Sequence, residues 1–297
     1  MDVLTAEPAQ TAAEERRWRT LRGWAIGSLA GNMGLILTGA LVRLTKSGLG
    51  CPTWPKCTNQ SLIPDSFGLH PAIEFGNRLL TFALIALAIG TFWAALRVRD
   101  NGRPRRDLVL IAFWAALGIP AQAVIGGITV LTQLNPYVVA GHLLVSVALV
   151  VVLVLLVRRA KRLEPQPVSA AGQLWARITF WLVMLSVVLG TLVTGSAPHG
   201  GDDEAARTGF TLEVVAKAHA WSVWAVIIAL AIAWWLTRSR AAAWLALAVV
   251  AQGLVGYLQY FNGLPIWIVA LHMIGVSVVS ALAANLLWGV RREVTTR

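Results

Sequence analysis

Long apolar runs divide this sequence into segments of nearly uniform length. A helix needs ~20 mostly apolar residues to cross the hydrocarbon core of a bilayer. Eight segments meet that length: 22–43, 72–96, 108–132, 137–157, 174–195, 212–236, 241–261 and 265–290. The stretches 108–157 and 241–290 contain no Asp, Glu, Lys or Arg, and each is interrupted once, by Asn135-Pro136 and by Asn262-Gly-Leu-Pro265. Each stretch is therefore expected to form two spanning helices joined by a tight turn.

Composition and charge agree with an all-α polytopic membrane protein of eight transmembrane helices. The chain is 57% hydrophobic and 13% charged, whereas soluble proteins carry roughly 25% charged residues. Of the 25 basic residues, 19 lie on one predicted side, in the two tails, the loops 97–106 and 158–177, and the turn at Arg238 and Arg240. The positive-inside rule therefore predicts that both termini are cytoplasmic. The net charge of +11 predicts contact with membrane lipid and not with nucleic acid.

Two halves of the sequence repeat one another. Ala121-Gln122 precedes His142 by the same spacing at which Ala251-Gln252 precedes His272, and Gly39-Ala-Leu-Val matches Gly190-Thr-Leu-Val. An even number of helices in each repeat predicts two tandem, parallel four-helix bundles related by an axis along the membrane normal. We expect a mostly disordered cytoplasmic tail (1–18) without a cleavable signal, a first bundle (19–160) with an outer loop (44–71), a cytoplasmic linker (161–172) and a second bundle (173–297).

Three histidines occupy related places in this repeat. His142, His219 and His272 each lie about six to eight residues inside the outer end of a predicted helix, and Asn77 lies at the matching depth. A His pair on facing helices commonly holds a haem iron, and the alternative is hydrogen bonding between helices. Because the histidines form a set at one depth, haem is favoured. His70 and His199 are expected to be loop residues.

The outer stretch 39–78 carries most of the remaining polar chemistry. Arg43-Leu-Thr-Lys-Ser-Gly-Leu-Gly-Cys51-Pro-Thr-Trp-Pro-Lys-Cys57 resembles the signature of haem A synthases, and Glu74 stands three residues before Asn77-Arg78 where that family has a His-Arg pair. Thr194-Gly-Ser-Ala-Pro-His-Gly-Gly-Asp202 resembles the family's second-half loop. The sequence departs from the family in having Asn77 in place of a His, and in lacking the second Cys pair that some members carry.

The resemblance implies a bacterial plasma-membrane enzyme of haem metabolism. These enzymes oxidise the C8 methyl of haem O to a formyl group by two hydroxylations and loss of water, which gives haem A for cytochrome c oxidase. His219 and His272 would hold a haem b cofactor, and the first half, with His142, would receive haem O. A haem O synthase is the implied partner.

The two halves differ in a way that places catalysis in the first. Two axial histidines suit electron transfer, whereas an open iron position suits substrate chemistry. Glu74 is one helical turn from Asn77 and either accepts a proton, stabilises a cationic intermediate, or merely pairs with Arg78 or Lys56. Arg43 and Arg78 either bind haem propionates or extend to the outer membrane interface.

The two cysteines face an oxidising compartment, where a disulfide persists. Cys51 and Cys57 are therefore expected to be linked, either as a structural staple or as a redox-active pair. At Asn77 the sequence leaves two alternatives: His142 is the single protein ligand of a first-half iron, or His70 replaces the lost His.

Other functions compatible with the sequence are a di-haem electron-transfer cytochrome b, a thiol-oxidising membrane protein and a transporter built on parallel repeats. The electron donor or acceptor, the source of oxygen and the oligomeric state are not encoded in any motif we identify.

Overall fold

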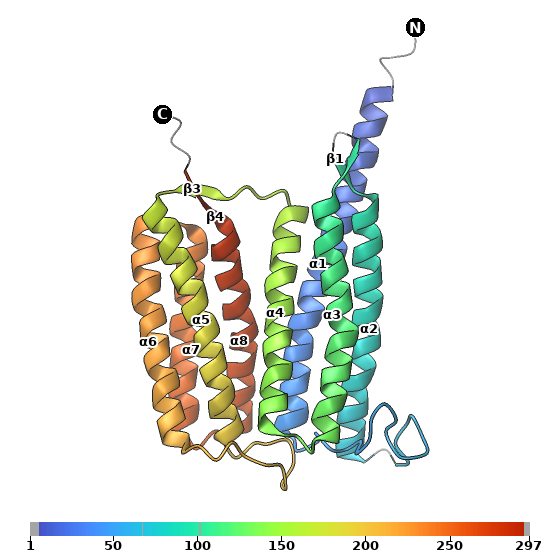
Figure 1. Cartoon of the computed structure of the whole chain (residues 1–297), viewed down its shortest axis with the longest axis vertical. Helices are drawn as coiled ribbons and strands as arrows, with labels where there is room; N and C mark the ends of the chain where they lie inside the picture. The colour runs from blue at the N-terminus through green and yellow to red at the C-terminus, as the bar shows by residue number, and fades with distance from the viewer. Residues whose placement is uncertain (1–5, 67, 101, 294–297) are drawn as a thin grey trace.

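The computed structural model describes residues 6–66, 68–100 and 102–293 and is dominated by eight helices (Figure 1). The helices are α1 (Ala6–Leu44), α2 (Leu69–Arg97), α3 (Arg106–Leu131), α4 (Pro136–Ala160), α5 (Ala170–Ser196), α6 (Leu212–Thr237), α7 (Arg240–Phe261) and α8 (Ile266–Gly289). All eight are long and apolar enough to cross a membrane. The predicted all-α, multi-pass membrane fold is confirmed, and seven of the eight spans begin and end within a few residues of the predicted bounds.

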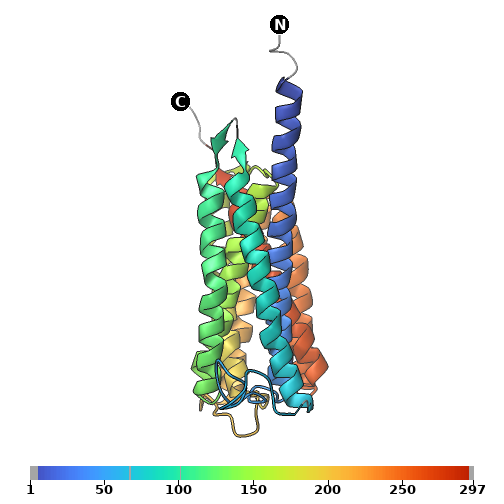
Figure 2. The ribbon, with the colours of Figure 1, turned by 90° about the vertical axis from the view of Figure 1, so that its right-hand side faces the viewer.

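The first helix differs from the prediction. Residues 6–18 are not a disordered tail, because α1 is continuous from Ala6 and extends well beyond the neighbouring helices (Figure 2). The Trp18 indole is 1% exposed, and the guanidinium groups of Arg105 and Arg162 lie over its ring. Arg22 also pairs with Glu15 across two turns of the helix. Burial of this aromatic side chain stabilises the helix around Trp18. Residues 1–5 lie outside the described residues.

The helices pack as two neighbouring groups (Figure 1). Helices α1 to α4 contact one another in a ring, α5 to α8 do the same, and the groups meet where α8 packs on α1 and α4 and where α4 packs on α5. One buried apolar cluster extends across this boundary into the second group and includes Ile36, Val150, Val154, Phe180, Leu245 and Ala284. These contacts are those that two four-helix bundles require, while the axis relating them and the domain boundaries stay predictions.

Tight turns join the helices of each uncharged hairpin. Asn135 caps α4 by accepting hydrogen bonds from the backbone of Tyr137 and Val138, and Pro136 opens the helix where no N–H is needed. The turn before α8 uses Gly263, whose φ of 73° favours glycine.

Two pairs of short strands lie at the opposite end from the cysteine loop (Figure 1). Strands β1 (Arg99–Asp100) and β2 (Arg103–Pro104) pair antiparallel, and β3 (Gln166–Val168) pairs in parallel with β4 (Val290–Arg292). The second pair ties the segment between the two groups to the end of α8.

Candidate active site

His219 of α6 and His272 of α8 face each other inside the second group of helices. Their ring centroids lie 6.4 Å apart and the rings are nearly perpendicular, at 82°. A metal ion bound to an imidazole nitrogen lies about 2 Å from it, so two His rings on opposite sides of one iron have centroids roughly 6 Å apart. The observed spacing fits a haem iron between the two rings.

Neighbouring polar groups bond the ring of His219 and the backbone of His272. The Nδ1 atom of His219 lies 2.9 Å from the carbonyl oxygen of Ser186, so Nδ1–H donates to that carbonyl and Nε2 is left as the lone-pair nitrogen. A metal-binding His is typically fixed by such a bond from its other ring nitrogen. Gln252 donates from its side-chain amide to the backbone carbonyl of His272, at 2.6 Å.

His142 of α4 shares two features with His272. Gln122 donates to the carbonyl of His142 at 3.1 Å, as Gln252 does for His272. The Nδ1 atoms of both histidines are buried and have no hydrogen-bond partner among the described residues. A buried polar nitrogen without a partner is costly unless another group satisfies it. His142 therefore resembles His272 in having a buried ring nitrogen that no described residue satisfies.

Asn77 of α2 takes the fourth position. Its side-chain oxygen Oδ1 accepts a hydrogen bond of 2.8 Å from the hydroxyl of Thr38 on α1. Thr38 was not singled out in the sequence, because nothing in its local pattern marks it. The one available signal is its place next to Gly39, which the repeat aligns with Gly190.

Glu74 and Arg78 form the link between α2 and the cysteine loop. Glu74 is 5% exposed; its Oε2 accepts from the backbone N–H of Cys51 at 2.6 Å and its Oε1 pairs with Arg78 at 2.5 Å. Arg78 in turn donates to the backbone carbonyls of Cys51, Thr53 and Lys56. The carboxylate thus has the partner that the sequence left as one alternative, and both of its oxygens hold the loop.

The loop between α1 and α2, here the cysteine loop, closes over one end of the first group. Cys51 and Cys57 form a disulfide, as predicted, and both are fully buried. Trp54 lies against Gly127 of α3, so closely that a Cβ atom at Gly127 would stand 2.3 Å from the indole. Gly127 follows Gly126, which faces His142. The loop therefore covers the helix that backs His142.

His70 is not a loop residue as predicted. It lies in the first turn of α2, which begins at Leu69 because Pro71 is tolerated where no intrahelical N–H bond is needed. Its exposed ring bonds Ser47 through Nδ1, at 3.0 Å. His199 does lie outside the helices, with its Nε2 2.9 Å from the carbonyl oxygen of Leu264.

The outer loop of the second group reaches the first group. Arg43 donates to the carbonyl of Thr194, the backbone of Gly48 donates to Gly201 at 2.9 Å, and Lys46 pairs with Asp203. Arg207, which the sequence did not single out, lies against Gly200, next to Gly201 and Arg43. The two loops that carry the family-like motifs therefore contact each other. We call these two loops together the outer cap.

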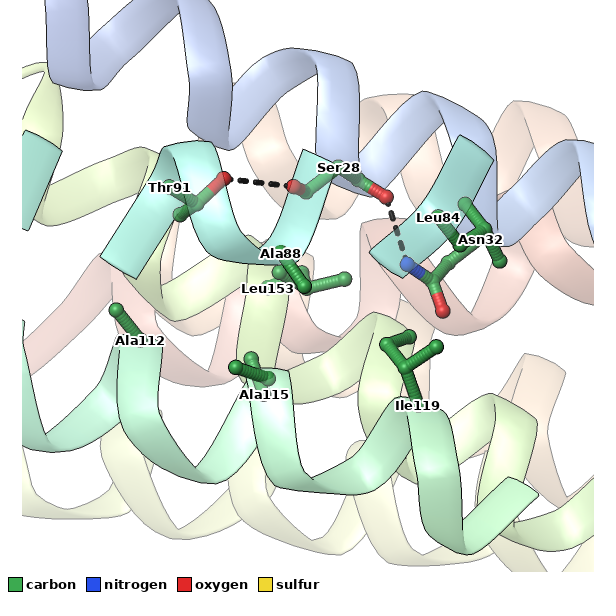
Figure 3. Close-up of a pocket in the computed structure, with 10 residues that line it drawn as sticks. Ser28, Asn32, Leu84, Ala88, Thr91, Ala112, Ala115, Ile119 and Leu153 are labelled. Atoms are coloured by element: carbon green, nitrogen blue, oxygen red, sulfur yellow. Dashed lines mark hydrogen bonds between the residues drawn. The ribbon is translucent and has the colours of Figure 1, made fainter. Parts of the chain in front are cut away.

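A small polar cavity lies deeper in the first group (Figure 3). The hydroxyls of Ser28 and Thr91 are hydrogen-bonded at 2.8 Å, and Asn32 donates to the Ser28 carbonyl at 2.8 Å. The cavity has a volume of ≈ 10 Å³ and is otherwise lined by apolar residues such as Ile119 and Leu153. It is near the size of one water molecule.

Sequence comparison places this arrangement in a family. The profile of the COX15-CtaA family, described as cytochrome oxidase assembly proteins, matches residues 22–69 and 67–199. The chain belongs to this family. The match includes the cysteine loop, Glu74, Asn77 and His142, and ends at His199.

Curated relatives carry a more specific name. "Heme A synthase" of Geobacillus thermodenitrificans is 34% identical over 142 residues, which are 47% of this chain and 42% of the relative. That of Geobacillus kaustophilus is 36% identical over 140 residues, 46% and 42% of the two chains. A "Protoheme IX farnesyltransferase" of Thermus thermophilus is 38% identical over 90 residues, 30% of this chain and 15% of the relative. The match spans less than half the length of the first two relatives.

Proposed function

We propose that this chain oxidises the C8 methyl of haem O to a formyl group by successive hydroxylations, with a haem b in the second half as redox cofactor. The observation that carries the proposal is the joint presence of a haem-spaced His pair in one half and a carboxylate beside an unpaired His position in the other. Family membership supports the same function.

The second half is proposed to hold the haem b. His219 and His272 would hold the haem through their imidazole rings, Ser186 fixes the tautomer of His219, and Gln252 positions the backbone of His272. A haem held by two histidines would supply one-electron transfer.

The first half is proposed to bind haem O through His142. Glu74 is the proposed proton acceptor near the substrate methyl; a positioned acid or base of this kind contributes ~10²–10⁴-fold in rate. Its hydrogen bonds to Cys51 and Arg78 couple the carboxylate to the loop. Arg43 is the proposed partner of a haem propionate. Arg78 stays a candidate for that role, although its guanidinium already donates to Glu74 and to loop carbonyls.

The cysteine pair keeps two proposed roles. As a staple, the disulfide holds the loop that carries Trp54 over α3. As a redox pair, it would exchange electrons with a donor or the substrate. Its complete burial supports the staple, because thiol–disulfide exchange requires access for the attacking thiol.

The alternative function is a di-haem electron-transfer protein without haem-modifying activity. That function has no need for Glu74 or for replacement of one axial His by Asn77. The asymmetry between the halves therefore supports the synthase.

The proposed location is the bacterial plasma membrane, with both termini in the cytoplasm and the cysteine loop outside. The start of α1 and strand β4 lie at one end of the molecule and the loop at the other (Figure 1), and the basic residues gather at the first of these ends. A farnesyl-transferring haem O synthase is the proposed supplier of substrate, in keeping with the name of the Thermus relative.

The decisive experiment is haem extraction after co-expression with a haem O source. Haem A should appear with the intact chain and be absent with a Glu74→Gln variant that still binds its second-half haem. Unmodified haem O in the intact chain, with both halves loaded, would contradict the proposal.

A further inference from the structure

A glycine on a neighbouring helix corresponds to each of the four positions His142, His219, His272 and Asn77. A Cβ atom built on Gly126, Gly190 or Gly256 would stand 3.3 Å from the Cε1 atom of His142, His219 or His272, respectively. Each imidazole therefore lies edge-on against a neighbouring helix that has no side chain there. Gly39, the repeat equivalent of Gly190, differs: a Cβ there would have no atom within 4 Å among the described residues.

The open space at Gly39 follows from the residue that replaces the fourth His. The repeat aligns Asn77 with His219, and an Asn side chain is shorter than an imidazole. The ring of His219 lies against Gly190, whereas a Cβ atom at Gly39 would meet no described atom within 4 Å. We attribute this difference to the shorter side chain of Asn77. The first half therefore has the glycine, Gly39, but lacks the imidazole ring that lies against Gly190 in the second half.

Thr38 decides which way the Asn77 amide faces. Its hydroxyl donates to Oδ1 of Asn77 at 2.8 Å, so the amide oxygen is used and the two Nδ2 hydrogens are what Asn77 presents elsewhere. The second half has Leu189 at the place of Thr38, where His219 is held instead by the Ser186 carbonyl. The hydroxyl thus occurs only in the half that has the amide.

We propose that Thr38, Gly39 and Asn77 form a binding site for a small oxygen ligand, water or dioxygen, on the face of the first-half haem opposite His142. This inference rests on the proposed function, because it requires a haem beside His142. Gly39 provides the space, and the Asn77 amide donates a hydrogen bond to the ligand. Thr38 is a positioning residue that acts through Asn77.

His70 does not supply the missing axial ligand in this arrangement. Its ring is exposed and bonds Ser47, and it lies seven residues before Asn77, nearer the outer end of α2. The position opposite His142 is therefore left to an exogenous ligand.

Carbon monoxide is a suitable probe, since it binds only a ferrous haem that has an open axial position. The full-length chain, shown by haem extraction to carry two haems, is reduced and titrated with the gas. One carbon monoxide should bind per two haems. Asn77→His should weaken binding at least tenfold and turn the first-half haem low-spin. Asn77→Leu, which cannot ligate iron, should keep binding but shift the C–O stretching frequency, because the amide donor is gone.

Thr38→Val tests the positioning role with little change in side-chain shape. Binding should persist, with a shifted C–O stretch and several-fold faster dissociation. Thr191→Val is the matched control: among the described residues the Thr191 hydroxyl bonds the Val188 carbonyl of its own helix, whereas that of Thr38 lies near the Leu35 carbonyl of its own helix and also reaches Asn77. The C–O stretch should not move in this control. A Thr38→Val variant with lowered thermal stability and an unchanged stretch would show a merely structural residue.

Three results overturn the inference. Two haems with no carbon monoxide binding would show that a protein ligand fills the sixth position. Binding that Asn77→His leaves unchanged would place the open iron elsewhere. A single haem per chain, even with haem O supplied, would remove the first-half site and the proposed function with it, which separates that failure from the other two.

Discussion

The two halves share a similar packing of four helices but differ in the side chains near the ends that carry the long loops. In the second, His219 and His272 are 6.4 Å apart between rings, and the ring of His219 is bonded to the Ser186 carbonyl. In the first, a Gln donates to the backbone carbonyl of His142 as in His272, but Asn77 replaces the second ring and a buried Glu74 lies one turn away. A few side chains on a similar frame therefore separate the proposed cofactor site from the proposed substrate site.

The comparison also shows where the added polar groups gather. Glu74 and Arg78 align with Ala216 and Ala220 of the second half, so the carboxylate, its cation and the loop they hold are all features of the first half. Because a buried carboxylate needs partners, Glu74, Arg78 and the backbone of Cys51 have to be present together. The catalytic proposal and the loop structure therefore depend on the same atoms.

The largest expected effect is loss of the low-spin signal of the second-half haem. His219→Ala and His272→Ala should each abolish the low-spin signal, because a haem iron with one axial ligand is high-spin. In the unaltered protein, rings crossed at 82° act on different iron d orbitals and leave them nearly equal in energy, so electron paramagnetic resonance should show strong g anisotropy. His70→Ala, which alters a ring bound to Ser47, is the control. A low-spin spectrum that remains in both variants would show that His219 and His272 are not the haem ligands.

Glu74→Gln should lower haem A formation by about 100-fold or more, in the range of a lost acid or base. The Gln side-chain oxygen can still accept from the backbone of Cys51, so the loop and the second-half haem should remain. Glu213→Gln is the control, since Glu213 forms the same i,i+4 pair with Lys217 on an exposed surface. Normal haem A formation in Glu74→Gln would leave the carboxylate a structural role only.

Cys51→Ser should lower the free energy of unfolding by about 2 kcal/mol, the entropy expected for a short closed loop. The thermal unfolding midpoint in detergent, with and without reductant, measures this. Thiol labelling of the native protein should find no free thiol before reduction, because the disulfide includes both cysteines of the chain. A loss of haem A formation much greater than the loss of folded protein would favour the redox role of the pair.

The smallest effect is expected at Asn32. Asn32→Val gives the first half the residue found at the equivalent Val183. It removes one hydrogen bond to the Ser28 carbonyl, which is worth about 1 kcal/mol, and replaces it with apolar packing. The free energy of unfolding should therefore change by less than that amount, and haem A formation should be retained. A strong loss of haem A formation would instead show that the residues around the cavity in Figure 3 contribute to the reaction.

The sequence predicts the helices and the three histidines well, because both are read from local pattern. Spans are set by the length of apolar runs, and His142, His219 and His272 all lie six to eight residues after the first residue of their helices. Helix α1 was underestimated because Trp18 is buried by side chains from two distant loops. No periodicity in a polar segment reveals such contacts.

The missed parts of the candidate site depend on contacts between distant residues. Thr38 lies 39 positions from Asn77, and the bond between Gly48 and Gly201 joins two loops in different halves. Apolar patterning carries no information about which loops meet. Arg207 was missed for the same reason, since only the fold brings it near Arg43 of the first half.

In the outer cap the two halves of the chain make contacts that one half could not make with a copy of itself. The backbone of Gly48 in the first half needs Gly201 of the second, and Gly201 adopts a φ of 101° that favours glycine. The first half has no Gly-Gly counterpart in its own loop, so a second copy of that half would not complete the cap. Two fragments cut between α4 and α5 are therefore expected to function only as an unlike pair, each recognising the other and not itself.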